Sequence, residues 1–531
     1  MESDRGRLWV CVIVLVCSHA TVATQPATGG LVVALAAGQL RGATRPSGGA
    51  EFLGIPYAQP PVGDLRWREP APVQSWSGVH DATAFGAPCA QPILGDWNKH
   101  DADTSSEDCL FLNVITPAWP PTDSLPVMFW IHGGGNAGGT ASSPLYKDGT
   151  LIQHRVILVT VNYRLGIFGF FTHPELTRES PHHASGNYGL MDQIAALRWV
   201  HDNIAKFGGD PANITVFGQS AGALDTSLLM TSPLSKDLFH GAIAESGSAL
   251  MAPLQFLAEA EQSGLKLAAS LKTPSGDGAI KYLRGLSTKE LVNAGVPPNP
   301  DQPPSLGPNI DGWVFSRPPA EIFASGQESE IPLIIGTTTR EFGMSASVDE
   351  VRKTIQHAAG SFADRALSLY GLANDGQGSS DPMYGSAGDQ WNADFAFRCP
   401  VTTQAAWHRA AHRPTYQYQF ERVIPGHEAE GAMHSGDLPY VFGFFPKTGN
   451  IAGNAGEADY RIADLIEIYW TNFAKKGNPN DGAMPMWPEF GSSQSFLQFA
   501  EDGRLLTNAT GMRKPQCDLY RELLLQHMNQ H

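Results

Sequence analysis

Short apolar runs separated by turn residues form the pattern of the first half of the chain. The runs at 125–132 and 155–163 are rich in β-branched and aromatic residues, which is typical of strands buried on both faces of a parallel sheet. Between 187 and 207 apolar residues recur at spacings of three and four, which predicts a helix with one buried face. Another apolar run at 214–217 predicts the next strand. Strand, helix and strand in this order form a βαβ unit, so we expect an α/β fold with a large, mostly parallel sheet and helices on both faces.

The second half continues this pattern with interruptions. The segments 241–245 and 331–336 are predicted to be later strands of the same sheet. The segments 254–304 and 349–390 contain helical patches broken by glycine and proline. We interpret these two segments as helical insertions that cap the sheet.

The composition is that of one large globular domain. The 531 residues contain no long polar linker or heptad run, and 42% of them are hydrophobic while 17% are charged. The formal net charge of −16 would repel phosphate backbones and anionic lipid. Neither nucleic acid nor an acidic membrane surface is therefore an expected partner.

The amino-terminal segment has the layout of a secretory signal. Two arginines precede an apolar run at 8–17, and small residues follow up to Ala23. Since the run is about half the length that spans a bilayer, an uncleaved membrane anchor is the weaker alternative. We predict a signal peptide at 1–23, cleaved after Ala20 or Ala23. The mature domain at 24–531 would be secreted, extracellular or periplasmic, without membrane attachment.

Loss of the signal would remove two of the six cysteines and leave an even number. In an oxidising compartment four cysteines predict two disulfides, although buried free thiols are an alternative. Four cysteines allow three pairings, and their spacing does not choose among them. The four residues are Cys89, Cys109, Cys399 and Cys517.

A serine between two glycines stands where an apolar strand is followed by a helix. The segment 217–222 reads Phe-Gly-Gln-Ser-Ala-Gly, and a helical run follows at 224–230. In this setting the tight turn forces the serine into a strained backbone conformation, and small neighbours let chain segments pass close by. The hydroxyl then lies near a helix amino terminus, which favours developing negative charge. We predict that Ser220 is a catalytic nucleophile.

A second glycine-rich segment, His132-Gly-Gly-Gly135, ends the strand predicted at 125–132. Backbone N–H groups in such a loop can approach a substrate closely because glycine has no side chain. Together with the N–H after the nucleophile they form an oxyanion hole, in which each donor is worth about 3 kcal/mol of transition-state stabilisation. The predicted donors are Gly134, Gly135 and Ala221.

Further motifs occur in one order along nearly the whole mature chain. They are Phe-Leu-Gly-Ile-Pro-Tyr-Ala at 52–58, Glu-Asp-Cys-Leu-Phe-Leu-Asn-Val at 107–114, Asn-Tyr-Arg at 162–164, Phe-Gly-Gly-Asp-Pro at 207–211 and Tyr-Trp-Thr-Asn-Phe at 469–473. With the serine and glycine motifs they make the chain resemble the type-B carboxylesterases, a family that also includes cholinesterases and some fungal lipases. The resemblance implies an α/β-hydrolase fold and hydrolysis of carboxylic esters without a metal or cofactor.

The resemblance also implies the partners of the serine. The stretch 432–443 is similar to the one that carries the family's catalytic histidine, and 335–343 is similar to the one that carries its acid. The histidine would take the serine proton, and the acid would fix the tautomer of the histidine. In the chain order serine, acid, histidine that this fold requires, the three residues are Ser220, Glu341 and His434.

Two other carboxylates are the next candidates for the acid, Asp311 and Asp437. Asp437 is only three residues from the histidine and better suits a supporting role. For the cysteines, the resemblance implies the bonds Cys89–Cys109, beside the entrance to the site, and Cys399–Cys517.

The chain departs from these relatives at four positions. Gln219 replaces the acid that precedes the nucleophile in cholinesterases, and Trp97 does not match by position the tryptophan on which they bind a cation. Both departures disfavour choline esters. Asn136 follows the three glycines where a bulky residue is common, which predicts a more polar or roomier pocket mouth. Asp225 stands where relatives usually carry a small residue, and the sequence offers no physical reason for it.

We therefore predict a secreted serine carboxylic ester hydrolase that acts through an acyl-enzyme. The segment 89–109 is too polar for a lid that seeks lipid, so a small or polar ester is the expected substrate and the only expected partner. The alternatives are a lipase, a cholinesterase-like esterase or a non-catalytic binding protein that kept the fold. The sequence makes no prediction about oligomeric state.

Overall fold

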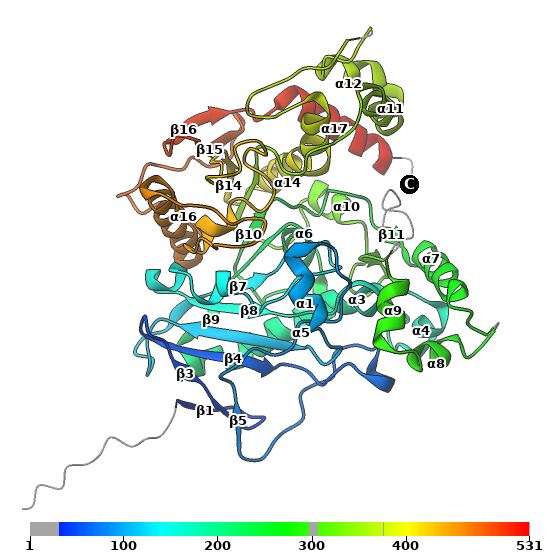
Figure 1. Ribbon diagram of the computed structural model, residues 1–531, viewed down its shortest axis with the longest axis vertical. Coiled ribbons are helices and arrows are strands. Elements are labelled where there is room, and N and C mark those ends of the chain that lie inside the picture. The colour runs from blue at the N-terminus through cyan, green and yellow to red at the C-terminus, as the bar shows by residue number, and fades with distance from the viewer. Residues whose placement is uncertain (1–30, 275, 297–305, 375, 530–531) are drawn as a thin grey trace, which may run out of the picture.

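The computed structural model describes residues 31–529 except 275, 297–305 and 375, so the predicted signal peptide at 1–23 lies outside the described residues. One large sheet runs through the molecule with helices around it (Figure 1). Within the described residues this sheet has eleven strands, in the order β16-β15-β14-β13-β10-β9-β7-β8-β6-β4-β3.

The centre of the sheet is parallel, as the apolar runs predict. Each strand pairs in parallel with its neighbours from β8 across to β15. The strand before the serine is longer than the run at 214–217, because its early residue Gly209 also pairs with Leu125. The seven parallel strands of the described chain are β8 (Ile157–Val161), β7 (Leu125–Ile131), β9 (Gly209–Gln219), β10 (Gly241–Glu245), β13 (Leu333–Thr338), β14 (Thr415–Phe420) and β15 (Ser495–Phe499).

Antiparallel strands close both edges. On one side they are β6 (Phe111–Thr116), β4 (Ala50–Pro56) and β3 (Ala43–Thr44), and on the other β16 (Leu505–Thr510). Two small sheets lie apart from the main one. They consist of β1 (Val32–Ala34), β2 (Gln39–Arg41) and β5 (Val79–Asp81), and of β11 (Gln255–Phe256) and β12 (Asn309–Ile310).

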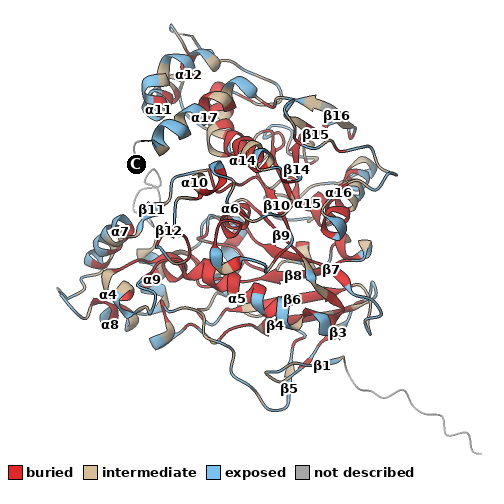
Figure 2. Cartoon of the chain, turned by 180° about the vertical axis from the view of Figure 1, so that it is seen from behind, coloured by how far each residue is buried: buried red, intermediate tan, exposed pale blue. Residues whose placement is uncertain are grey.

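Alternate residues of the central strands face two separate cores, because successive side chains of a strand point to opposite faces. On β7, Val127 and Phe129 pack with the apolar face of α5 (Tyr188–Asn203), the helix predicted at 187–207. Met128 and Trp130 pack on the other face with α16 (Glu457–Lys476). Figure 2 shows the sheet strands buried between these layers.

The two predicted insertions are helical where the structure describes them. The first contains α7 (Leu257–Ser270), α8 (Ala279–Arg284) and α9 (Thr288–Ala294). The second contains α11 (Val348–Ala359), α12 (Ala363–Leu369) and α13 (Ala387–Ala393), and it runs through a π-helical turn at Asp394–Arg398 into α14 (Cys399–Ala410). Figure 1 shows α11 and α12 beside the last helix, α17 (Lys514–Met528), and away from α7, α8 and α9.

Both disulfides are present. Cys89–Cys109 closes a segment that we call the disulfide loop (89–109), and Cys399–Cys517 joins α14 to α17. These are the pairings that the family resemblance implies. Among the described residues, no helix combines the length and the apolar character needed to cross a membrane.

Candidate active site

Ser220 lies between β9 and α6 (Ala221–Leu229) in a backbone conformation that serine rarely adopts. Its φ is 58° and its ψ is −121°. The Ser220 N–H donates to the Glu245 carbonyl at 2.8 Å, which ties the turn to the neighbouring strand. A Cβ on Gly222 would lie 2.0 Å from the Ile131 carbonyl oxygen, so only glycine fits there. The turn is strained and held in place by its surroundings, as predicted for a nucleophile at a strand-to-helix turn.

The loop of three glycines passes close to the serine. A Cβ on Gly133 would lie 3.1 Å from Ser220 Cβ, and the φ angles of Gly134 and Gly135 are 115° and 65°, which favour glycine. A Cβ on Gly135 would have no neighbour within 4 Å, so the loop faces open space there. In the described part of the chain the N–H groups of Gly134, Gly135 and Ala221 donate to no other residue. They can therefore receive an oxyanion.

Two neighbouring strands bring His434 and Glu341 together. Glu341 follows β13, His434 lies in the loop after β14, and the His434 N–H donates to the Glu341 carbonyl at 3.0 Å. His434 Nδ1 lies 2.5 Å from Glu341 Oε2, while Oε1 of the same carboxylate accepts the Thr338 N–H at 2.9 Å. Both side chains are buried. An imidazole held in this way carries its proton on Nδ1 and keeps Nε2 as a base.

The side-chain amide of Gln219 is within hydrogen-bond distance of the other ring nitrogen of His434. Its Nε2 lies 3.1 Å from His434 Nε2, and an amide donor suits the lone pair that is left there when Nδ1 is protonated. Among the described residues the Ser220 hydroxyl makes no hydrogen bond with His434. In this structure His434 Nε2 is thus paired with the Gln219 amide and not with the Ser220 hydroxyl.

Neither alternative acid makes a hydrogen bond to His434 within the described chain. Asp311 accepts three backbone N–H groups of the turn that follows it, which explains its burial. Asp437 accepts the Tyr418 hydroxyl at 3.0 Å. Burial and the charge of Glu341 raise the pKa of Asp437 to about 6. Asp437 thus lies near the pair without touching the imidazole.

A further buried carboxyl near the pair was not singled out by the sequence. Glu245 ends β10, and Trp470 Nε1 donates to its Oε1 at 2.7 Å. Burial, and then the charge of Asp437, raises the pKa of Glu245 well above its ordinary value. No motif marks this residue, because it reaches the site through the position of β10 beside β9 in the sheet.

Comparison with known proteins places the chain in a family. A profile of the carboxylesterase family matches residues 30–520. The fumonisin B1 esterase of Sphingopyxis macrogoltabida is 36% identical over 462 residues, which cover 84% of this chain and 83% of that protein. Cocaine esterase from Homo sapiens is 36% identical over 487 residues (84% and 83%), and carboxylesterase 1D from Mus musculus is 35% identical over 503 residues (86% of each). The chain belongs to the carboxylesterase family.

Membership settles two of the predictions. The sheet of this carboxylesterase is that of the α/β-hydrolase fold, and the protein is a carboxylic ester hydrolase. The alternative of a non-catalytic binding protein that kept the fold is thereby set aside.

Two exposed aromatic rings lie at the site of this carboxylesterase, one on each side. Phe342 is 52% exposed, and its ring centroid lies 4.2 Å from that of His434. Trp97 is 43% exposed, and its ring would lie 3.2 Å from a Cβ on Gly134. Trp97 does not match by position the cation-binding tryptophan of cholinesterases, but the path of the disulfide loop still brings its ring to the glycines.

Two buried amides, those of Gln91 and Asn98, hold the disulfide loop against the segment that follows the three glycines. The Gln91 side chain donates to the Gly139 carbonyl at 2.9 Å and accepts the Gly139 N–H at 2.8 Å. Asn98 Nδ2 donates to Gln91 Oε1 at 3.1 Å. The loop also exposes Ile93 and Leu94, so its description as polar from the sequence was incomplete.

Asn136 does not make the mouth of the pocket polar. Its side chain is 5% exposed, and its amide is hydrogen-bonded in the interior to Asp225 and Tyr163. Of the more polar or roomier mouth predicted at this position, the polar alternative is wrong, because Asp225, the other unexpected residue, provides an inward partner.

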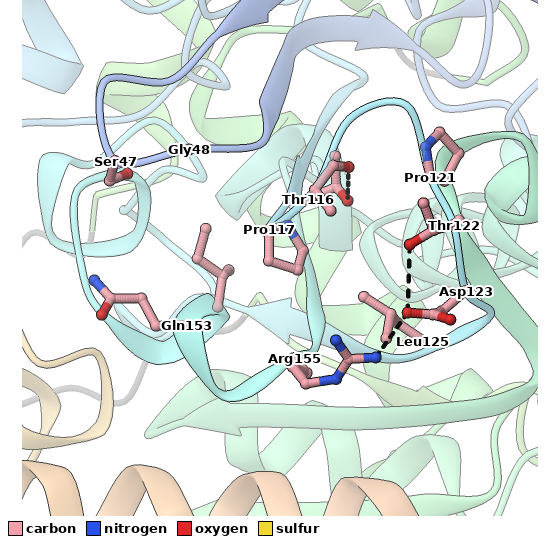
Figure 3. A pocket seen from close by; sticks show the side chains of 13 residues that line it. Ser47, Gly48, Thr116, Pro117, Pro121, Thr122, Asp123, Leu125, Gln153 and Arg155 are labelled. Atoms are coloured by element: carbon pink, nitrogen blue, oxygen red, sulfur yellow. Dashed lines mark hydrogen bonds and ion pairs between the residues drawn. The ribbon is translucent and has the colours of Figure 1, made fainter.

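A pocket of about 390 Å³ lies at the amino-terminal ends of the central strands, away from Ser220 (Figure 3). Among its lining residues, Leu125 begins β7, and Arg155 and Gly208 come just before β8 and β9. Ser220 follows the carboxyl end of β9 instead. The Arg155–Asp123 ion pair of this pocket is exposed, and the pocket contributes nothing to the serine site.

One group of potential metal ligands occurs among the described residues, His154, Asp464 and Glu467. Glu467 already accepts hydrogen bonds from Thr150 and His154 at 2.8 and 3.1 Å. These contacts account for the cluster, and we assign no metal to it.

Proposed function

We propose that this carboxylesterase uses Ser220 as nucleophile, His434 as general base and acid, and Glu341 as the carboxylate that orients His434. One observation carries the proposal. The strained Ser220 turn faces a glycine loop with free N–H groups, next to a buried His434–Glu341 pair. This combination of nucleophile, oriented base and oxyanion donors is what acyl transfer requires.

In acylation the Ser220 oxygen attacks the ester carbonyl carbon while His434 Nε2 takes the hydroxyl proton. The carbonyl electron pair moves to oxygen, which accepts the N–H groups of Gly134, Gly135 and Ala221. His434 then gives its proton to the alcohol oxygen, the C–O bond breaks, and the acyl group stays on Ser220. A water molecule repeats these steps on the acyl carbon, which releases the acid and restores the serine hydroxyl.

The substrate we propose is a water-soluble carboxylic ester with an apolar or aromatic group near the reacting carbonyl. The hydrogen bonds of Gln91 and Asn98 favour a fixed disulfide loop over a mobile lipid-seeking lid. The exposed rings of Trp97 and Phe342 favour an apolar group, which modifies the expectation of a purely polar ester. Trp97 also keeps a choline ester as the second candidate, because an indole face binds quaternary ammonium.

We also propose that the protein is secreted after loss of residues 1–23. The charged and apolar layout of the segment and the two disulfides support export to an oxidising compartment. Expression in a secreting host should give a medium form that begins at Thr21 or Thr24, as read by intact mass. A secreted protein that keeps Met1 would contradict cleavage.

A fluorophosphonate probe and a panel of esters test the catalytic proposal together. The probe should label Ser220 alone, as found by peptide mass spectrometry. The panel contains p-nitrophenyl esters of graded acyl length, phenyl esters, butyrylthiocholine and an emulsified triglyceride. The names of two relatives make fumonisin B1 and cocaine useful additions.

The highest kcat/KM should fall on a soluble phenyl or medium-chain ester. Preference for butyrylthiocholine would replace this substrate class with choline esters, and preference for the emulsion would replace it with lipids. Label on another serine would remove Ser220 from the proposal.

A further inference from the structure

The two residues that set this chain apart at the oxyanion loop and at α6 contact each other. Asn136 Nδ2 donates to Asp225 Oδ1 at 2.9 Å, across 89 positions of sequence. Asp225 is fully buried and Asn136 nearly so. Each is unexplained alone, whereas together they form a hydrogen-bonded pair.

The pair is part of a network that holds both ends of the glycine loop. The Tyr163 hydroxyl lies 3.0 Å from the Asn136 side-chain oxygen and 3.0 Å from the His132 carbonyl oxygen. These two residues flank the three glycines on either side. On the opposite side of the carboxylate, Gln193 Nε2 of α5 donates to Asp225 Oδ2 at 2.6 Å. The loop is thus tied through side chains to two helices.

Asp225 lies four residues after Ala221 on α6. Residues four apart lie on the same helix face, so Asp225 is one turn from Ala221 on that face. Ala221 would supply one oxyanion donor from the start of α6, and Gly134 and Gly135 would supply the others from the loop. The Asp225–Asn136 hydrogen bond therefore links the two segments that must be in register for an oxyanion to receive all three N–H groups.

Stability does not explain a carboxyl at this position. The partners that Asp225 meets are neutral amides, those of Asn136 from the loop and Gln193 from α5, and burial raises its pKa to about 7. Nearby, Tyr163 is a neutral phenol, and burial lowers the pKa of His132 to about 4, so it is uncharged as well. A buried carboxyl without a cation destabilises a fold. A carboxyl here, hydrogen-bonded to the loop, points to a role in the geometry of the site.

We propose that Asp225 and Asn136 are positioning residues that hold the glycine loop against α6 and so align the three oxyanion donors. The proposal rests on the function proposed for Ser220. Neither side chain would touch substrate, because both are buried. The prediction is a selective loss of transition-state stabilisation when the hydrogen bond is broken.

The test compares Asp225→Ala, Asn136→Gly, the double variant and Asp225→Asn in the full chain. Glycine is chosen at 136 because φ there is 55°, which alanine would adopt only with strain. With p-nitrophenyl butyrate, each single change should lower kcat about 10- to 100-fold and leave KM within about threefold. The double variant should lose no more than the worse single one, because one link is broken in each case. Asp225→Asn should stay within about threefold of the parent, since its amide oxygen can accept from Asn136.

A trifluoromethyl ketone separates alignment from general damage. Ser220 adds to its carbonyl carbon and passes its proton to His434, so the product carries an oxyanion in the predicted hole. The affinity for this ketone should fall by the same factor as kcat in Asp225→Ala and in Asn136→Gly. Ser227→Ala is the matched control, because it removes a buried hydrogen bond of α6 that runs to Gln404 instead of the loop. The control should keep both values within about threefold.

Two results would overturn the positioning role of Asp225 and Asn136. One is an unchanged kcat in folded Asp225→Ala and Asn136→Gly, and the other is losses that multiply in the double variant. If Asp225→Ala does not fold, Asn136→Gly and Asp225→Asn still decide the question. Ser220→Ala in the same panel identifies the source of a failure. If Ser220→Ala retains turnover, the proposed function is wrong. If Ser220→Ala is inactive while Asp225→Ala and Asn136→Gly have normal kcat, only the positioning role is wrong.

Discussion

The two sides of the site are built by different physical means. On the serine side, the main chain fixes Ser220 and the glycine loop through close approaches, such as the 2.0 Å that a Cβ on Gly222 would leave to the Ile131 oxygen. On the histidine side, His434 and Glu341 sit on loops, and buried acids such as Asp437 lie near them with raised pKa values. Steric constraint therefore sets the first side and electrostatics the second. Loss of the Ser220 hydroxyl should therefore act regardless of pH, whereas a change of charge near His434, at Gln219 or Asp437, should act through the pH dependence of rate or stability.

The largest effect should come from Ser220→Ala, with a loss of about 10⁵- to 10⁶-fold in kcat at every pH between 6 and 9. Ser220→Gly should be equally inactive but more stable than Ser220→Ala, because glycine accepts a φ of 58° without strain. Thermal melts of the pair measure this difference. Equal stability of the two variants would remove strain from the description of the serine side.

The next effect concerns the acid. Glu341→Gln keeps the shape but removes the charge that fixes the tautomer of His434, so kcat should fall about 10³- to 10⁴-fold even at pH 9. Asp311→Asn is the matched control and should stay within about tenfold. Near-parent rates for Glu341→Gln above pH 8 would move the role of the acid to Asp437 or Asp311, both of which would then need to be replaced in turn.

A smaller effect should follow from Gln219→Glu. A carboxylate at the position of the amide, 3.1 Å from His434 Nε2, favours the imidazolium form. The acid limb of kcat/KM should therefore move to higher pH by about one unit, with kcat above that limb reduced less than about tenfold. Gln219→Met, which keeps the length without charge or amide, should leave the limb in place. A limb that moves equally in both variants would show that the contact, and not the charge, is responsible.

The smallest effect on rate, within about tenfold, should be that of Asp437→Asn, which acts mainly on stability. The pKa of Asp437 is raised from 3.8 to about 6, so the folded state binds a proton that the unfolded state has released between these values. Ionisation of Asp437 thus destabilises the fold as the pH rises, and the penalty is complete above about pH 6. Asp437→Asn should melt higher than the parent at pH 8, and the gain should shrink at pH 4.5. Equal gains at both pH values would contradict this electrostatic description.

The local patterns of the sequence predicted much of the fold and half of the site. The apolar runs marked the parallel strands, and glycines beside a strand marked Ser220 and the loop at 133–135. The histidine-side pair was found only through family resemblance, because His434 and Glu341 lie in loops where no periodicity marks them. Glu245 was missed because its position near the pair comes from the neighbour that β10 has in the sheet.

The sequence by itself determined the elements and the strained turn, because burial patterns and glycine requirements act over a few residues. Tertiary structure alone decided which side chains meet. Gln219 reaches His434 across 215 positions and Asn136 reaches Asp225 across 89, while the disulfide loop carries Trp97 to Gly134. A hydrogen bond requires its two atoms to be within about 3 Å of each other. Only the strand order and the packing of the helices bring residues so far apart in the chain to that distance.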